Sequence, residues 1–225
     1  MNIFKRAVSL LLSASLLGTY AFAADSDNLL ANESFNEYAT NEIPSDLAIS
    51  AKAYCISEYE DKNKGLKLYA GTAASSLDID IPVSKNICVS FDILTGGKNP
   101  SGELEAVNSS GVAQTLLNFS ENGDVGAENG FPLGGFGKAK SSYSVVFKAA
   151  DGLCDVYRNG KKVVSDFKIA KCKISAVSRI RFMFASDTGE DFVILDNVNV
   201  TDGENPRKSY PTAEFNEQAD DENSF

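Results

Sequence analysis

The sequence of 225 residues contains no histidine and no tryptophan. Without histidine, the chain cannot form Ser-His-Asp or Cys-His nucleophile systems, and every His-ligated zinc site is excluded. A helical apolar stripe is also lacking, because no stretch sustains apolar residues at i, i+3, i+4 and i+7. These absences point to a β-protein whose function does not depend on histidine chemistry.

Only the N-terminus carries a long apolar run. Lys5 and Arg6 precede an apolar stretch over 7–17, and Ala21-Phe22-Ala23 provides an A-x-A cleavage site. This pattern predicts a signal peptide over 1–23. No second stretch approaches the ~20 apolar residues that span a bilayer. We therefore expect a secreted or cell-surface protein, without membrane insertion, that begins near Ala24.

Basic residues are scarce after the predicted signal peptide, with 19 against 31 acidic residues. This balance argues against nucleic acid or an anionic membrane as partner, because both favour clustered Lys and Arg. Residues 202–225 combine acidity with low apolar content, so we predict an acidic linker or disordered tail there. Phe35-Asn36-Glu37 recurs at 215–217, which is compatible with further domains of a larger chain.

The remaining segment, 24–201, is predicted to be one all-β domain, an antiparallel jelly-roll β-sandwich. Short runs rich in β-branched or alternating residues are separated by Gly, Asn, Asp and Ser clusters, as in packed antiparallel sheets. Asn159-Gly160 between two such runs predicts a type I′ hairpin. The expected strands cover 29–35, 53–59, 65–70, 77–81, 87–94, 102–108, 115–119, 142–148, 153–158, 161–166, 178–185 and 192–201.

The sequence contains four cysteines, Cys55, Cys88, Cys154 and Cys172. In an exported chain this even number permits up to two disulfides in three connectivities, and free thiols are the alternative. Cys88 alternates with Ser90 and Asp92, on the face opposite Val89 and Phe91. We therefore expect Cys88 to lie off the main core face and near the surface.

Several motifs resemble known jelly-roll families. The opening Asn28 to Asn36 (NLLANESFN) and the closing Ile194 to Val200 (ILDNVNV) resemble carbohydrate-binding modules with a galactose-binding-like fold. Val89-Ser90-Phe91-Asp92 and the hairpin over 155–164 are similar to laminin-G or concanavalin-like domains. The resemblance implies the same sandwich architecture and glycan or cell-surface polysaccharide as partner.

The resemblance also implies a structural calcium between the first and last strands, although no cofactor is otherwise required. Its residues here would be Asn36 and Asp196, with Glu33 nearby. Asn36 stands where the family has Glu, which removes one anionic oxygen from a cation that prefers carboxylates. The alternative for Asp196 is a carboxylate that hydrogen-bonds a neighbouring loop.

Glu103 and Glu105 come closest to a catalytic pair, because they share one face of a predicted strand. Concanavalin-like glucanases carry E-x-D-x-x-E, whereas here Glu105 replaces the Asp and Asn108 replaces the last Glu. Two acids on an outer strand also fit a solvated face. We therefore assign no catalytic residue.

Sugar binding by jelly rolls relies on exposed aromatic rings. With tryptophan absent, the candidates are Tyr54, Tyr59, Tyr69, Phe131 and Phe136. The two phenylalanines lie in a glycine-rich loop and could instead plug the edge of the core, which we favour. The first interpretation is a non-catalytic carbohydrate-binding or adhesion module. The alternatives are a structural spacer or scaffold domain of a larger cell-surface protein and an unusual glycan-active enzyme.

The calcium hypothesis predicts a metal-dependent stability. If calcium binds only the folded chain, millimolar calcium should raise its melting temperature, with a dissociation constant of about 10⁻⁴ to 10⁻³ M. The measurement compares thermal melts in chelator and in calcium, for the wild type and for Asp196→Ala. An undiminished calcium shift in the variant, or no shift in the wild type, would refute the site.

Overall fold

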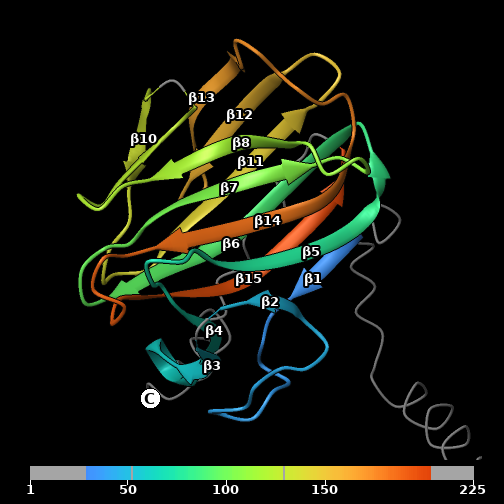
Figure 1. The fold of residues 1–225 in the computed structure, drawn as a ribbon. Helices are drawn as coiled ribbons and strands as arrows, with labels where there is room; N and C mark the ends of the chain where they lie inside the picture. Colours follow the sequence, from blue (N-terminus) through green and yellow to red (C-terminus); the bar gives the residue numbers. More distant parts are fainter. Residues whose placement is uncertain (1–28, 52, 129, 204–225) are drawn as a thin grey trace, which may run out of the picture.

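The fold is a sandwich of two antiparallel sheets, as predicted (Figure 1). The computed structural model describes residues 29–51, 53–128 and 130–203. The predicted signal peptide over 1–23 lies outside these residues, as does the predicted tail from residue 204 onward. Within the described part, no helix is long and apolar enough to cross a membrane.

Each sheet pairs strands that are distant in sequence, because the chain crosses repeatedly from one layer to the other. The eight-stranded sheet is ordered β13 (Lys161–Lys168), β12 (Leu153–Arg158), β11 (Ser141–Lys148), β6 (Asn86–Gly96), β15 (Phe192–Asp202), β4 (Lys64–Tyr69) and β3 (Tyr54–Glu58), with β1 (Leu29–Glu33) also beside β15. The seven-stranded sheet is ordered β10 (Pro132–Gly135), β9 (Asp124–Gly126), β8 (Ala113–Phe119), β7 (Ser101–Val107), β14 (Val177–Ala185), β5 (Ser75–Ser84) and β2 (Ala48–Ser50).

Every predicted strand has a counterpart in the structure. The strands not predicted are β2, β9 and β10, which have only three or four residues each. Such short segments carry no measurable alternation, and β9 and β10 are rich in glycine. A single 3₁₀ turn, η2 (Glu60–Lys62), connects β3 to β4.

Aromatic rings join the two sheets at the centre of the core. The ring of Phe91 on β6 lies 5.0 Å from that of Phe182 on β14, edge to face, and 5.9 Å from that of Tyr143 on β11. All three residues are at most 2 % exposed. These contacts join β6 of one sheet to β14 of the other across the core.

Strand β15 changes partner part-way along its length. On one side it pairs with β6 throughout, while on the other side β4 pairs with Phe192 to Leu195 and β1 pairs with Val198 to Thr201. Between these two halves, the register with β6 shifts by one residue at Asp196 to Asn199. The inward Val198 and Val200 and the outward Asn199 agree with the predicted alternation.

Cys88 is 1 % exposed, so the expectation that it lies near the surface was wrong. Its face was correctly predicted, because its strand neighbours Ile87 and Val89 belong to the inter-sheet core and Cys88 does not. It lies opposite Val146 and Thr201 in the outer layer of side chains, where adjacent strands flank it on both sides. Cys55, Cys154 and Cys172 are free thiols in the structure.

The hairpin between β12 and β13 yields a stability prediction. Asn159 has φ of 48° and Gly160 has φ of 74°, as the predicted type I′ turn requires. Gly160→Val should lower the free energy of unfolding by roughly 1 to 3 kcal/mol, because a β-branched residue resists positive φ. Thermal melts should show a lower midpoint for Gly160→Val than for the control Lys161→Val. Equal midpoints would show that the turn tolerates a side chain.

Candidate functional site

A β-bulge in β15 creates a polar cluster on the outer face of the eight-stranded sheet. Asp196 lies directly opposite Asp92 of β6, and one extra residue of β15 follows before the pairing resumes at Asn199. The bulge breaks the strand alternation, so Asp196 and Asn197 both point outward. Asn197 adopts a left-handed φ of 50°, which asparagine tolerates better than most residues.

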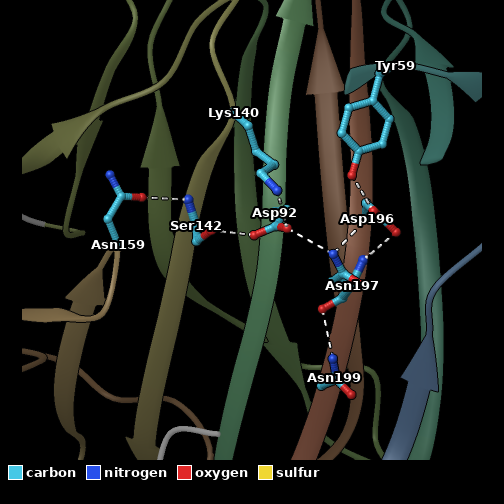
Figure 2. Close-up of polar contacts among 8 residues, drawn as sticks. All are labelled: Tyr59, Asp92, Lys140, Ser142, Asn159, Asp196, Asn197 and Asn199. Atoms are coloured by element: carbon cyan, nitrogen blue, oxygen red, sulfur yellow. Dashed lines mark hydrogen bonds and ion pairs between the residues drawn. The ribbon is translucent and has the colours of Figure 1, made fainter. Parts of the chain in front are cut away.

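The amide of Asn197 bridges the two carboxylates (Figure 2). Its Nδ2 donates to Oδ2 of Asp92 at 2.9 Å and to Oδ2 of Asp196 at 3.2 Å. Its backbone N–H donates to Oδ1 of Asp196 at 2.7 Å. Like charges directly opposite on a sheet repel, and these hydrogen bonds offset that repulsion.

Three further side chains complete the cluster, which we call the outer-face cluster. The hydroxyl of Ser142 donates to Oδ1 of Asp92 at 2.5 Å, and Nζ of Lys140 lies 3.6 Å from Oδ2 of Asp92. Tyr59, which follows β3, donates its hydroxyl to Oδ2 of Asp196 (Figure 2). Asn159 anchors the β11 side, because its Oδ1 accepts from the backbone N–H of Ser142 at 2.9 Å.

Burial sets the electrostatics of the cluster. Asp92 is 7 % exposed and Asp196 is 2 % exposed. Burial raises the pKa of Asp196 to about 6, and the charge of Asp92 adds to this increase, while the hydrogen bonds from Tyr59 and from the Asn197 backbone oppose it. Burial, followed by the Asp196 carboxylate, raises the pKa of Tyr59 far above its usual value.

The buried carboxylates therefore position other groups rather than contact a ligand themselves. The side chains above them, Asn197, Lys140 and Ser142, are half-buried and present amide, ammonium and hydroxyl groups to solvent. Asn199 extends this row along β15 and donates to the carbonyl of Asn197 at 2.9 Å. The arrangement can hydrogen-bond a hydroxyl-rich ligand without further rearrangement of the sheet.

An aromatic platform lies on the same face, four residues earlier on β15. The rings of Phe192 and Tyr69 lie 5.7 Å apart, and Nζ of Lys67 lies over both, 3.8 Å and 4.6 Å from the respective ring centroids. Phe192 covers Gly96 of β6, where a Cβ would overlap the ring. At the usual strand rise, the platform is roughly 13 Å from the outer-face cluster.

The aromatic candidates from the sequence separate into two groups. Tyr59 and Tyr69 lie on the outer face described above, whereas Tyr54 packs against the core. Phe136 is 6 % exposed and contacts Phe119 at 5.3 Å, so it plugs the core edge and is not an exposed ring. Phe131 is 45 % exposed, with its ring 6.3 Å from that of Phe167, away from the platform.

Two of the three predicted calcium ligands, Asn36 and Asp196, accept hydrogen bonds from other groups. Oδ1 of Asn36 accepts from the backbone N–H of Lys64 at 3.1 Å, and Asp196 is held by Tyr59 and Asn197. Burial raises the pKa of Glu33, and the charges of Asp46 and Glu37 add to it. Across the described ranges, no cluster of three or more His, Cys, Asp or Glu residues is arranged to hold a metal. Calcium binding stays a prediction.

Glu103 and Glu105 lie on the outer face of the seven-stranded sheet, away from the outer-face cluster. Glu105 is only 8 % exposed, and Nη1 of Arg181 lies 3.6 Å from its Oε2. Burial, then the charge of Glu103, raises the pKa of Glu105. The face is therefore less solvated at Glu105 than the sequence suggested, and Arg181 occupies the space beside the carboxylate.

The site residues predicted from the sequence do not include Asp92, Lys140, Ser142, Asn159 or Phe192. One signal in the sequence could have located the bulge. Inward apolar residues occupy odd positions up to Leu195 and even positions from Val198, and such a change of parity requires one extra residue. The partners on β6 and β11 had no comparable signal, because their proximity depends on strand order.

Comparison with known proteins identifies the fold but no family. No family model and no curated protein matches the sequence. Similar solved structures include a sialidase (TM-score 0.59, 16 % identity, 77 % of this chain and 18 % of that chain). Another is the binding domain of Paraclostridial Mosquitocidal Protein 1 (TM-score 0.54, 13 % identity, 80 % of this chain and 50 % of that chain). A third is a botulinum neurotoxin type C structure (TM-score 0.50, 11 % identity, 80 % of this chain and 48 % of that chain). This chain thus spans half or less of each of these proteins.

The raised pKa of Asp196 predicts a pH-dependent stability. Its folded pKa of about 6 exceeds the unfolded value of about 3.9, so the folded chain binds the proton more tightly. The free energy of unfolding of the wild type should therefore fall, relative to Asp196→Asn, by roughly 2 kcal/mol as the pH rises from 4 to 6. Urea unfolding of both proteins between pH 4 and pH 8 measures this difference. A pH-independent difference would contradict the assignment.

Proposed function

We propose that this protein is an exported, non-catalytic carbohydrate-binding module that binds glycans on the outer face of its eight-stranded sheet. One observation carries the proposal: the aromatic platform and the outer-face cluster share this face, roughly 13 Å apart along β15. Aromatic rings stack on the apolar face of a pyranose, while amide, hydroxyl and ammonium groups pair with its hydroxyls. The separation suits an oligosaccharide better than a single sugar ring.

Preorganisation supports this choice of face. Asn197 and Ser142 are fixed by hydrogen bonds to the buried Asp92, and Phe192 is fixed by Tyr69 and Lys67. Ordering them therefore costs little conformational entropy on binding. The opposite outer face is dominated instead by ion pairs such as Arg179 with Asp80 and Arg181 with Asp78.

The similar structures support the class of ligand. One is a sialidase. Another is botulinum neurotoxin type C, whose entry into cells depends on interaction with two ganglioside molecules. The absence of histidine supports binding without catalysis. The ion pair between Arg181 and Glu105 supports it as well. The predicted signal peptide supports export.

Glycan arrays and immobilised polysaccharides provide the test. The wild type should bind at least one glycan class, and Tyr69→Ala should lower its affinity by about tenfold through loss of stacking. Lys140→Ala should also lower the affinity, because it removes a half-exposed hydrogen-bond donor. Arg179→Ala, on the outer face of the other sheet, serves as the control and should bind like the wild type.

Three outcomes would reject the proposal. A wild type that binds no glycan would favour the spacer or scaffold interpretation. Normal binding by both Tyr69→Ala and Lys140→Ala would place the glycan on another surface. Release of reducing sugar from a bound glycan would identify the protein as an enzyme.

A further inference from the structure

A cavity lies at one end of the sandwich, where β6, β8 and β14 end in neighbouring loops (Figure 1). It is a cavity of about 500 Å³, which we call the rim cavity. A second cavity of about 490 Å³ lies beside it and shares Asp187 and Thr188. The polar side chains that line the rim cavity include Lys98, Asn99, Glu121, Asn122, Lys138 and Asp187.

A buried carboxylate fixes the frame of the rim cavity. Asp191 is 5 % exposed and accepts hydrogen bonds from Ser186 Oγ at 2.5 Å, from Thr188 Oγ1 at 2.7 Å and from the backbone N–H of Lys98 at 2.8 Å. These bonds join the loop after β14 to the loop after β6. The hydrogen bond from Ser186 lowers the pKa of Asp191 most, so the carboxylate stays charged at neutral pH.

The other two loops are joined to the same frame. The backbone N–H of Thr95 donates to the carbonyl of Gly137 at 2.8 Å, which connects the end of β6 to the loop after β10. The N–H of Phe136 donates to the carbonyl of Gly123 at 2.8 Å, which connects that loop to the one after β8. Four loops from distant parts of the chain therefore form one hydrogen-bonded rim.

The side chains on this frame are not used by the fold. Among the described residues, no side chain or backbone group forms a hydrogen bond or an ion pair with the charged groups of Lys98, Lys138, Glu121 or Asp187. All four residues are exposed. The cavity volume lies within the ~300 to ~1,000 Å³ of small-molecule sites, and a rigid frame holds the polar groups of a site in place.

We propose that the rim cavity binds a sugar that carries a carboxylate group. Two ammonium groups from separate loops, at Lys98 and Lys138, converge on one cavity in a chain with 31 acidic and 21 basic residues. The charge of Lys98 contributes to the lowered pKa of Asp191, and both exposed ammonium groups are available to an anionic group, which a neutral sugar lacks. Glu121 and Asp187 require hydrogen-bond donors, which a simple anion lacks but sugar hydroxyls supply. A carboxylated sugar satisfies both requirements, and the residues that line this cavity include none of the aromatic platform or the outer-face cluster.

The test uses the purified protein and NMR titrations with D-galacturonate, methyl β-D-galactopyranoside and acetate. Galacturonate should shift the amide signals of Lys98, Asn122 and Thr188, and it should bind at least tenfold more tightly than the neutral sugar or acetate. Added salt should weaken its binding, because exposed charges are screened.

Variants locate the binding. Lys98→Gln and Lys138→Gln should each lower galacturonate affinity by about tenfold, whereas Lys138→Arg should retain most of it because the charge remains. Lys85→Gln, in the turn between β5 and β6, is the matched control and should bind like the wild type. Tyr69→Ala should also leave galacturonate binding unchanged, which separates this site from the proposed glycan face.

Four results would overturn the proposal. Equal affinity for the neutral sugar would remove the role of the carboxylate. Equal affinity for acetate would mean attraction of any anion. Absence of galacturonate binding, or binding unaffected by both lysine variants, would show that the rim cavity holds no acidic sugar.

Discussion

The polar organisation of the outer face depends on one extra residue in β15. Because of the bulge, Asp196 and Asn197 share a face, and the Asn197 amide can donate to the opposed carboxylates of Asp92 and Asp196 at once. The same bulge lies where β4 ends and β1 takes over as the neighbour of β15, which lets Tyr59 reach Asp196. Without the extra residue, Asn197 would point into the core, where an unpaired amide is costly.

The two candidate surfaces are built on the same physical principle. A buried carboxylate accepts hydrogen bonds from neighbouring segments and fixes them: Asp196 and Asp92 on the sheet, and Asp191 at the rim. Buried charges are tolerated only where hydrogen bonds replace water, so each carboxylate requires a precise set of donors. The exposed side chains nearby are then held by a rigid support and stay available for a ligand.

The core and the surfaces follow different constraints. The inter-sheet core needs only apolar volume at alternate positions, which Phe91, Phe182 and Tyr143 provide. This explains how a sialidase and toxin binding domains share the fold at 16 % identity or less. Recognition depends on the outer faces and loops, where side chains vary without loss of the sandwich.

The sequence by itself determined the strands of five or more residues, the positive-φ turn at Asn159-Gly160 and the all-β antiparallel class, because these depend on local periodicity and turn chemistry. Tertiary structure decided which outward residues meet. Asp92 and Asp196 are 104 positions apart, and they face each other only because β6 and β15 are neighbours in the sheet. The burial of Cys88 and Phe136 was decided in the same way, since alternation predicts a face but the neighbouring strands and loops determine what covers it.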